Sequence, residues 1–165
     1  MFCFQCEQTA KGQGCNTMGV CGKTPEVANL QDLLVYKLRE LSQLAILANG
    51  AGLRDEKTDV FTSEALFATL TNVNFEPQAI IDYLKKAEQL QLQLQQKLEN
   101  KNPYLKLEHT KQGLVAQGKE HGIKAEPNMN ADLHSLIWLL TFGLKGVAAY
   151  TYHAYLLGKK ENKVF

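Results

Sequence analysis

The fold is decided by residues 24–52, which read TPEVANLQDLLVYKLRELSQLAILANGAG. Thr24 is suited to cap a helix that starts at Pro25, because the fixed φ of proline fits the first helical turn. Gly50 and Gly52 are suited to end that helix. Its apolar residues recur at helical spacing: Leu30, Leu33, Leu34, Leu38, Leu41, Leu44, Ala45 and Ala48. The stretch therefore predicts one long helix with a leucine face in the core.

Toward the C-terminus the pattern predicts further helices and no strand. We expect a shorter helix capped by Thr62 or Ser63 after a charged connection at 53–60, a helix over 78–100, a short one over 110–121 and a long one over 131–157 capped by Asn130. The last helix carries an apolar stripe that we expect in the core: Leu133, Leu136, Ile137, Leu140, Leu144, Val147, Ala148, Tyr150 and Tyr155. Gly143 and Gly146 inside it predict a bend or a close helix crossing.

These elements indicate an all-α fold of four to six helices, packed as two antiparallel bundles of the three-helix type. We interpret residues 1–165 as a single domain. Within it, 1–23 form a cysteine-rich, cluster-binding loop, 24–158 form the helical bundle and 159–165 form a charged tail.

Composition excludes several classes of function. The net charge is +1, which gives no electrostatic basis for binding nucleic acid or an anionic membrane. No apolar run reaches the roughly 20 residues that a bilayer span needs. The start of the chain lacks the basic and apolar regions of a signal peptide, so we expect a cytoplasmic protein in a reducing compartment.

All four cysteines lie in the N-terminal loop, at Cys3, Cys6, Cys15 and Cys21. The pair Cys3-x2-Cys6 places two sulfurs on one side of a tight turn, and Cys15 and Cys21 can return across a glycine-rich segment. Four thiolates satisfy an iron–sulfur cubane or a tetrahedral metal ion. The spacing favours an iron–sulfur cluster, with these four residues as its ligands.

Three alternatives stay open on spacing alone. Structural zinc sites with four cysteines more often come as two C-x-x-C pairs. A thioredoxin-type redox pair at Cys3 and Cys6 would need a preceding strand, which the sequence does not predict. Disulfides are rare in a reducing compartment, and here they could only close one short loop on itself.

The motifs together resemble the hybrid cluster protein family, also called hydroxylamine reductase or prismane protein. The matching segments follow the family order along nearly the whole chain: 1–9 (MFCFQCEQT), 14–15 (GC), 19–23 (GVCGK), 30–34 (LQDLL), 70–75 (LTNVNF), 143–150 (GLKGVAAY) and 153–154 (HA). The resemblance implies an α-helical domain that holds a [4Fe-4S] cluster on Cys3, Cys6, Cys15 and Cys21. It also implies that this cluster passes electrons to a second, hybrid iron–sulfur–oxygen cluster. In the full-length protein that cluster reduces hydroxylamine to ammonia, and nitric oxide reduction and peroxidase activity are associated with it.

The chain departs from the family in length and in cysteines. Family members are about three times longer, and their hybrid-cluster ligands lie in later domains, whereas this sequence has no cysteine after Cys21. We interpret it as a truncated N-terminal domain that transfers electrons but is not catalytically competent alone. Its expected partners are a redox donor protein, the remaining domains of the full-length protein and a second copy bound through the exposed domain interface. The alternative is a helical interaction module with a structural four-cysteine zinc site.

Overall fold

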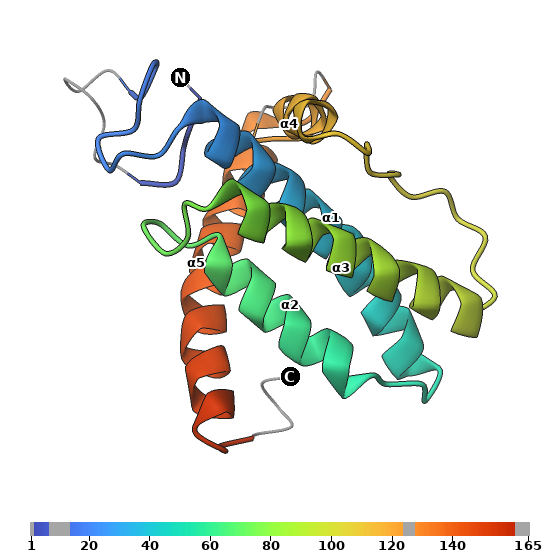
Figure 1. Ribbon diagram of the computed structural model, residues 1–165. Coiled ribbons are helices and arrows are strands. Elements are labelled where there is room, and N and C mark those ends of the chain that lie inside the picture. The colour runs from blue at the N-terminus through green and yellow to red at the C-terminus, as the bar shows by residue number, and fades with distance from the viewer. Residues whose placement is uncertain (1, 7–13, 124–127, 161–165) are drawn as a thin grey trace.

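The computed structural model describes residues 2–6, 14–123 and 128–160. The described residues form five α-helices and no strand (Figure 1): α1 (Pro25–Gly50), α2 (Glu56–Ala68), α3 (Pro77–Lys97), α4 (Lys111–Glu120) and α5 (Ala131–Leu156). This confirms the predicted all-α bundle. Most of the predicted charged tail lies outside the described residues.

The core is built around α1. Figure 1 shows α2 running back along α1, and α3 returning beside α1 in the same direction as α1. Thr24 caps α1 as predicted, since its hydroxyl accepts a hydrogen bond of 3.2 Å from the amide of Val27. The leucine face of α1 packs mainly against α3 and α4, and Leu30, Leu33 and Leu41 are fully buried there. Burial of this apolar face stabilises the fold.

The short helix α4 lies close against α1. Thr110 caps it by accepting a hydrogen bond of 3.1 Å from the amide of Gly113. At Gly118 a Cβ atom would lie 1.9 Å from the carbonyl oxygen of Asn29, so only glycine fits at this contact. The backbones of α4 and α1 therefore touch directly.

Helix α2 begins earlier than the sequence pattern indicates. Asp55 is its N-cap residue, and the Thr58 hydroxyl donates a hydrogen bond of 2.6 Å to the Asp55 carboxylate. The prediction of a connection over 53–60 with a cap at Thr62 or Ser63 is therefore wrong. Acidic residues in a first helical turn are stabilised by the helix dipole, so a charged turn that resembles a loop in composition is helical here.

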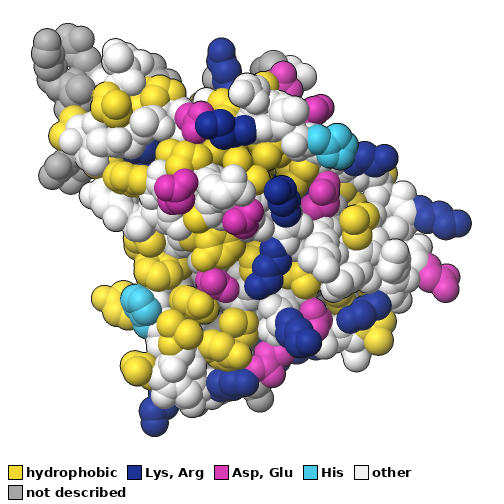
Figure 2. Space-filling view, viewed as in Figure 1, with side chains coloured by type: hydrophobic (Ala, Val, Ile, Leu, Met, Phe, Trp, Pro, Cys, Tyr) yellow, Lys and Arg dark blue, Asp and Glu magenta, His cyan; other side chains and the backbone are white. Residues whose placement is uncertain are grey.

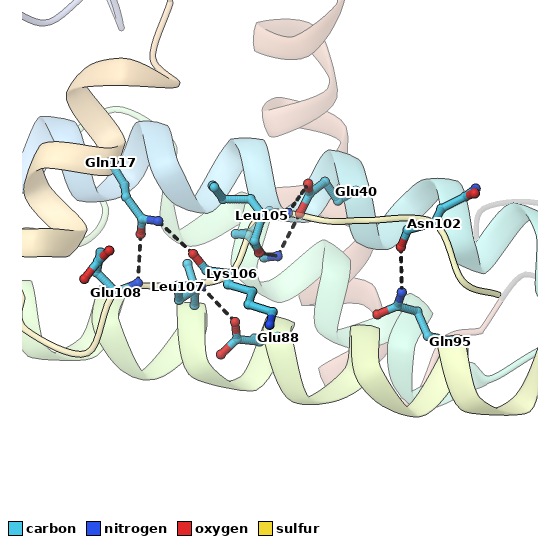
Figure 3. Close-up of polar contacts among 10 residues, drawn as sticks. Glu40, Glu88, Gln95, Asn102, Leu105, Lys106, Leu107, Glu108 and Gln117 are labelled. Carbon is cyan, nitrogen blue, oxygen red and sulfur yellow. Dashed lines mark hydrogen bonds and ion pairs between the residues drawn. The ribbon is translucent and has the colours of Figure 1, made fainter. Parts of the chain in front are cut away.

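An extended segment at residues 101–108 links α3 to α4 across the face of α1 and α3 (Figure 3). Two of its backbone amides donate to carboxylates on those helices. The amide of Leu105 donates to Glu40 on α1, and the amide of Leu107 donates to Glu88 on α3, both at 2.9 Å. The buried Lys37 also donates to the carbonyl of Leu105, at 2.7 Å.

Helix α5 starts at the predicted residue, ends one residue before the predicted boundary and has the predicted Asn130 cap, but its apolar stripe is not in the core. Most of the stripe is exposed, including Leu136, Leu140 and Tyr150, which are 61%, 64% and 83% exposed. The expectation of a buried stripe is therefore wrong for most of these residues. The reason is that α5 packs mainly against α2, while much of its apolar stripe is exposed among the described residues.

The two glycines of α5 do not mark a close crossing. A Cβ atom added at Gly143 or Gly146 would meet nothing within 4 Å among the described residues. The helix also runs without interruption from Ala131 to Leu156. The predicted close crossing at these glycines is therefore wrong.

Hydrophobic side chains gather on the surface where α5 lies beside α2 (Figure 2). By length and composition α5 is also long and apolar enough to cross a membrane, and it is the one such helix in the described part of the chain. The expectation that no apolar stretch reaches the length of a bilayer span is therefore wrong. Those two properties are shared by core helices and by interface helices, so they do not distinguish a membrane from a protein partner.

Candidate metal centre

The four cysteines line one cavity. Its walls are Cys3, Gln5, Cys6, Cys15, Gly19, Val20, Cys21, Lys23 and Thr71. None of the four cysteines forms a disulfide. In the described part of the chain no three His, Cys, Asp or Glu side chains gather closely enough to hold one metal ion. The cysteines therefore share a cavity without forming a ready tetrahedral site.

Backbone hydrogen bonds hold the two cysteine-bearing segments together. The amide of Phe2 donates to the carbonyl of Cys15 at 3.0 Å, which places the first segment beside the second. A tight turn follows, in which the amide of Gly19 donates to the carbonyl of Lys23 at 2.8 Å. A Cβ atom at Gly19 would lie 3.2 Å from the sulfur of Cys21, so glycine permits this close approach.

Gln5 anchors the C-x-x-C turn to the helical body from its position between Cys3 and Cys6. The hydroxyl of Thr71 donates to its backbone carbonyl at 2.9 Å. The ammonium group of Lys145, on α5, donates to its side-chain oxygen at 2.7 Å. The loop is thus fixed by the α2–α3 connection and by α5.

Lys23 anchors the other end of the loop. Its ammonium group donates to the side-chain oxygen of Gln31 at 2.7 Å, and the amide group of Gln31 donates to the carbonyl of Asn74 at 2.8 Å. Lys23 is 1% exposed and Gln31 is fully buried. This chain of contacts joins the loop to α1 and to the α2–α3 connection.

Asp32 on α1 is a buried acidic group that interacts with the charges of both lysines. Burial raises the pKa of Asp32 to about 7, and the nearby positive charges of Lys145 and Lys23 oppose that rise. The Gln5 side chain and the backbone of Ile123 also hydrogen-bond to its carboxyl group. Burial lowers the pKa of Lys145 to about 8, and Asp32 opposes that change. Gln5 therefore connects a buried acid and a buried base.

The cysteine cavity is electrostatically unusual at Cys3. Burial raises the pKa of its thiol, while a hydrogen bond from the Gln5 backbone and the charge of Lys23 lower it. A bound cation would reverse the effect of burial, because metal ligation requires the thiolate. The donor set, four cysteine sulfurs on one cavity beside two buried lysines, fits an iron–sulfur cluster.

The structure brings together all four predicted cysteines, and their role as ligands stays a prediction. Sequence reasoning missed the polar groups behind them, namely Gln5, Lys23, Asp32 and Lys145. A signal was present, since Asp32 and Lys145 are charged residues that interrupt apolar helical runs within the family-like segments 30–34 and 143–150. A charge in such a run is costly to bury without a partner.

Comparisons with known proteins show which family the chain resembles. Residues 1–165 match the Prismane/CO dehydrogenase family. The hydroxylamine reductase of Syntrophobacter fumaroxidans is 46% identical over 174 residues, which cover 100% of this chain and 32% of that protein. The hydroxylamine reductases of Geobacter metallireducens and Geobacter sulfurreducens are 44% and 46% identical over 180 residues, and these cover 100% of this chain and 33% and 32% of those proteins.

The chain spans about a third of the length of these curated relatives. The family match covers every residue of the chain, including the cysteine loop and all five helices. The chain therefore belongs to the Prismane/CO dehydrogenase family.

Proposed function

We propose that this chain is the electron-transfer part of a hydroxylamine reductase and holds a [4Fe-4S] cluster on Cys3, Cys6, Cys15 and Cys21. The observation that carries the proposal is the convergence of these four cysteines on one cavity, in a chain similar to hydroxylamine reductases along its whole length. When bound, the cluster would supply one-electron transfer. The protein would supply four thiolates, the turn at Gly19 and the anchoring of Gln5.

The reaction of the whole protein would be reduction of hydroxylamine to ammonia. The hybrid iron–sulfur–oxygen cluster that the resemblance implies needs further cysteines, and this chain has none after Cys21. We therefore assign this chain to electron delivery and the catalytic cluster to other parts of a longer protein. Nitric oxide reduction and peroxidase activity would belong to that longer protein too.

Anaerobic reconstitution with iron and sulfide tests the cluster assignment. We expect a brown protein with four irons per chain and an absorbance band that bleaches on reduction. The variant Cys15→Ser should lose most of the bound iron, because Cys15 is the buried member of the set. A colourless protein after reconstitution would overturn the assignment.

The second candidate is a helical interaction module with structural zinc on the same four cysteines. It is favoured by the firm anchoring of the loop to the helices, which a structural site would stabilise further. Metal analysis of freshly purified, anaerobic protein separates the two, because one zinc and no iron would support this alternative.

The proposed partners follow from the same surfaces. They are a one-electron donor protein at the cysteine loop, and the remaining domains of the longer protein or a second copy on the exposed face of α5. We propose a cytoplasmic protein without nucleic-acid or membrane partners, given the net charge of +1. Lys145 supports a protein partner for α5. It places a charged side chain in the middle of the one described helix that is apolar enough to span a bilayer, and its ammonium group donates hydrogen bonds to Gln5 and Thr69.

A further inference from the structure

The charged side chains buried in the described residues are concentrated behind the cysteine loop. Four are buried in all: Lys23, Asp32, Lys37 and Lys145. Lys23 lines the cysteine cavity, Asp32 hydrogen-bonds to Gln5, and Lys145 donates to Gln5. Burying a charge is costly, so three of them around one loop require a physical reason.

Lys145 is the most distant of the three in sequence, 140 residues from Gln5. It is 1% exposed, and its ammonium group reaches from α5 to the side chain of Gln5 at 2.7 Å and to the carbonyl of Thr69 at 3.3 Å. Both acceptors are neutral, so these contacts leave most of its charge uncompensated. At pH 7 the amine is mainly protonated, because its pKa lies at about 8.

The charges behind the loop do not cancel. Two buried cations, Lys23 and Lys145, face one buried carboxylic acid, Asp32, which is only partly ionised near neutral pH. A site with four thiolates around an iron–sulfur group becomes more negative when it accepts an electron. A buried cation beside it favours the reduced form, because solvent screens the interaction weakly there.

We propose that Lys145 is a positioning residue that, through Gln5, holds the C-x-x-C turn and raises the reduction potential of the cluster. This inference rests on the proposed function, since it requires an iron–sulfur group at the cysteines. It assigns α5 a role in tuning electron transfer, in addition to its packing on α2.

The test is a redox titration of the reconstituted chain at pH 7, followed by absorbance and by electron paramagnetic resonance. In Lys145→Gln a neutral amide replaces the ammonium group and can still donate to Gln5. We expect the equilibrium constant for reduction to fall about tenfold, which is about 59 mV for a one-electron couple. Lys145→Arg keeps the charge and should restore most of the potential.

A second variant guards against misfolding of the first. Gln5→Glu keeps Lys145 and places a carboxylate beside it, so we expect the potential to fall in the same direction. The matched control is Lys37→Gln, which removes an equally buried lysine twelve residues beyond Pro25, about 18 Å along α1. It should reduce stability and leave the potential unchanged.

The outcomes separate the two proposals. A wild-type chain that binds no iron overturns the proposed function. A wild-type chain with four irons, together with unchanged potentials in Lys145→Gln and Gln5→Glu, overturns the role of Lys145 and leaves the proposed function standing. An equal shift in Lys37→Gln would also overturn it, because the effect would then follow from loss of stability.

Discussion

Helices α1 and α5 have the same length, 26 residues, and opposite surroundings. Thirteen residues of α1 are buried, whereas Lys145, Ala148 and Thr151 are the buried ones described in α5. Yet α5 is the more apolar of the two and α1 carries more charged residues. Apolar composition therefore does not determine burial here; the number of neighbouring helices does.

The difference shows that the other helices of this chain enclose α1 and leave much of α5 exposed. Helix α1 is enclosed by α3, α4 and α2, while α5 packs mainly against α2. An exposed apolar face of this extent is typical of an interface. Since the chain spans about a third of its relatives' length, we propose that the free face of α5 meets another domain or a second copy.

The largest expected effect compares a leucine on each helix. Leu33 on α1 is fully buried and Leu140 on α5 is 64% exposed. Leu33→Ala should lower the free energy of unfolding by about 2–5 kcal/mol, because it leaves a cavity in the core. Leu140→Ala should change it by less than about 0.5 kcal/mol. Urea unfolding of the reduced, metal-free chain measures both, and similar losses would show that the face of α5 is covered.

A second prediction concerns Asp32 on α1, whose pKa is affected by the charge of Lys145 on α5. The pKa of Asp32 is about 7 in the folded chain, against an ordinary value of 3.8, so near pH 5 the folded state retains a proton that the unfolded state has lost. This group therefore lowers stability as pH rises from about 4 to about 7. Asp32→Asn should remove that loss, so the stability of the variant relative to wild type should increase over this range, on the order of 3 kcal/mol.

Urea unfolding at several pH values across that range measures the difference. Removal of the Asp32 carboxylate also removes a negative charge that raises the pKa of Lys145, so the pKa of that lysine falls further. This change also makes the stability of the variant, relative to wild type, rise with pH. A difference between variant and wild type that does not vary with pH would contradict the assignment of Asp32.

The sequence predicted the elements better than it predicted their surroundings. The caps at Thr24 and Asn130 and the leucine face of α1 were predictable, because each depends on residues close together in the chain. The start of α2 was not, because its charged first turn looks like a loop. The exposure of α5 was not, because an apolar stripe indicates a face that needs cover without indicating what covers it.

The same distinction holds for the candidate site. The four cysteines were predictable, since C-x-x-C and its two companions form a local spacing pattern. The contact of Lys145 with Gln5 was not, since it joins residues 140 positions apart. Long-range polar contacts of this kind depend on how the helices pack, which no local pattern encodes.

A third prediction tests the free face of α5 directly. We expect the isolated chain to self-associate through it, so that sedimentation equilibrium shows a concentration-dependent mass. Leu136→Glu, at a residue that is 61% exposed, should weaken the association about tenfold or more, because it places a charge in the apolar contact. Leu92→Glu on α3 is the control, since Leu92 is 54% exposed on another helix. Strictly monomeric behaviour at all concentrations would contradict the prediction.

The smallest expected effect compares two glycines. Gly143 lies on the open face of α5, where an added Cβ meets nothing within 4 Å among the described residues. Gly143→Ala should therefore raise the free energy of unfolding by about 0.5–1 kcal/mol, because alanine has the higher helix propensity. Gly118→Ala on α4 should have the opposite sign, since its Cβ would lie 1.9 Å from the Asn29 carbonyl on α1.

Thermal and urea unfolding of the two variants, each measured against wild type, decides the comparison. A stabilised Gly143→Ala that still self-associates would place the contact elsewhere along α5. A stabilised Gly143→Ala with weakened association would place Gly143 within the contact between copies, where a methyl group obstructs the approach of the second helix. A loss of stability at low concentration would mean that α5 is already covered in the monomer, and the contrast between α1 and α5 would then fail.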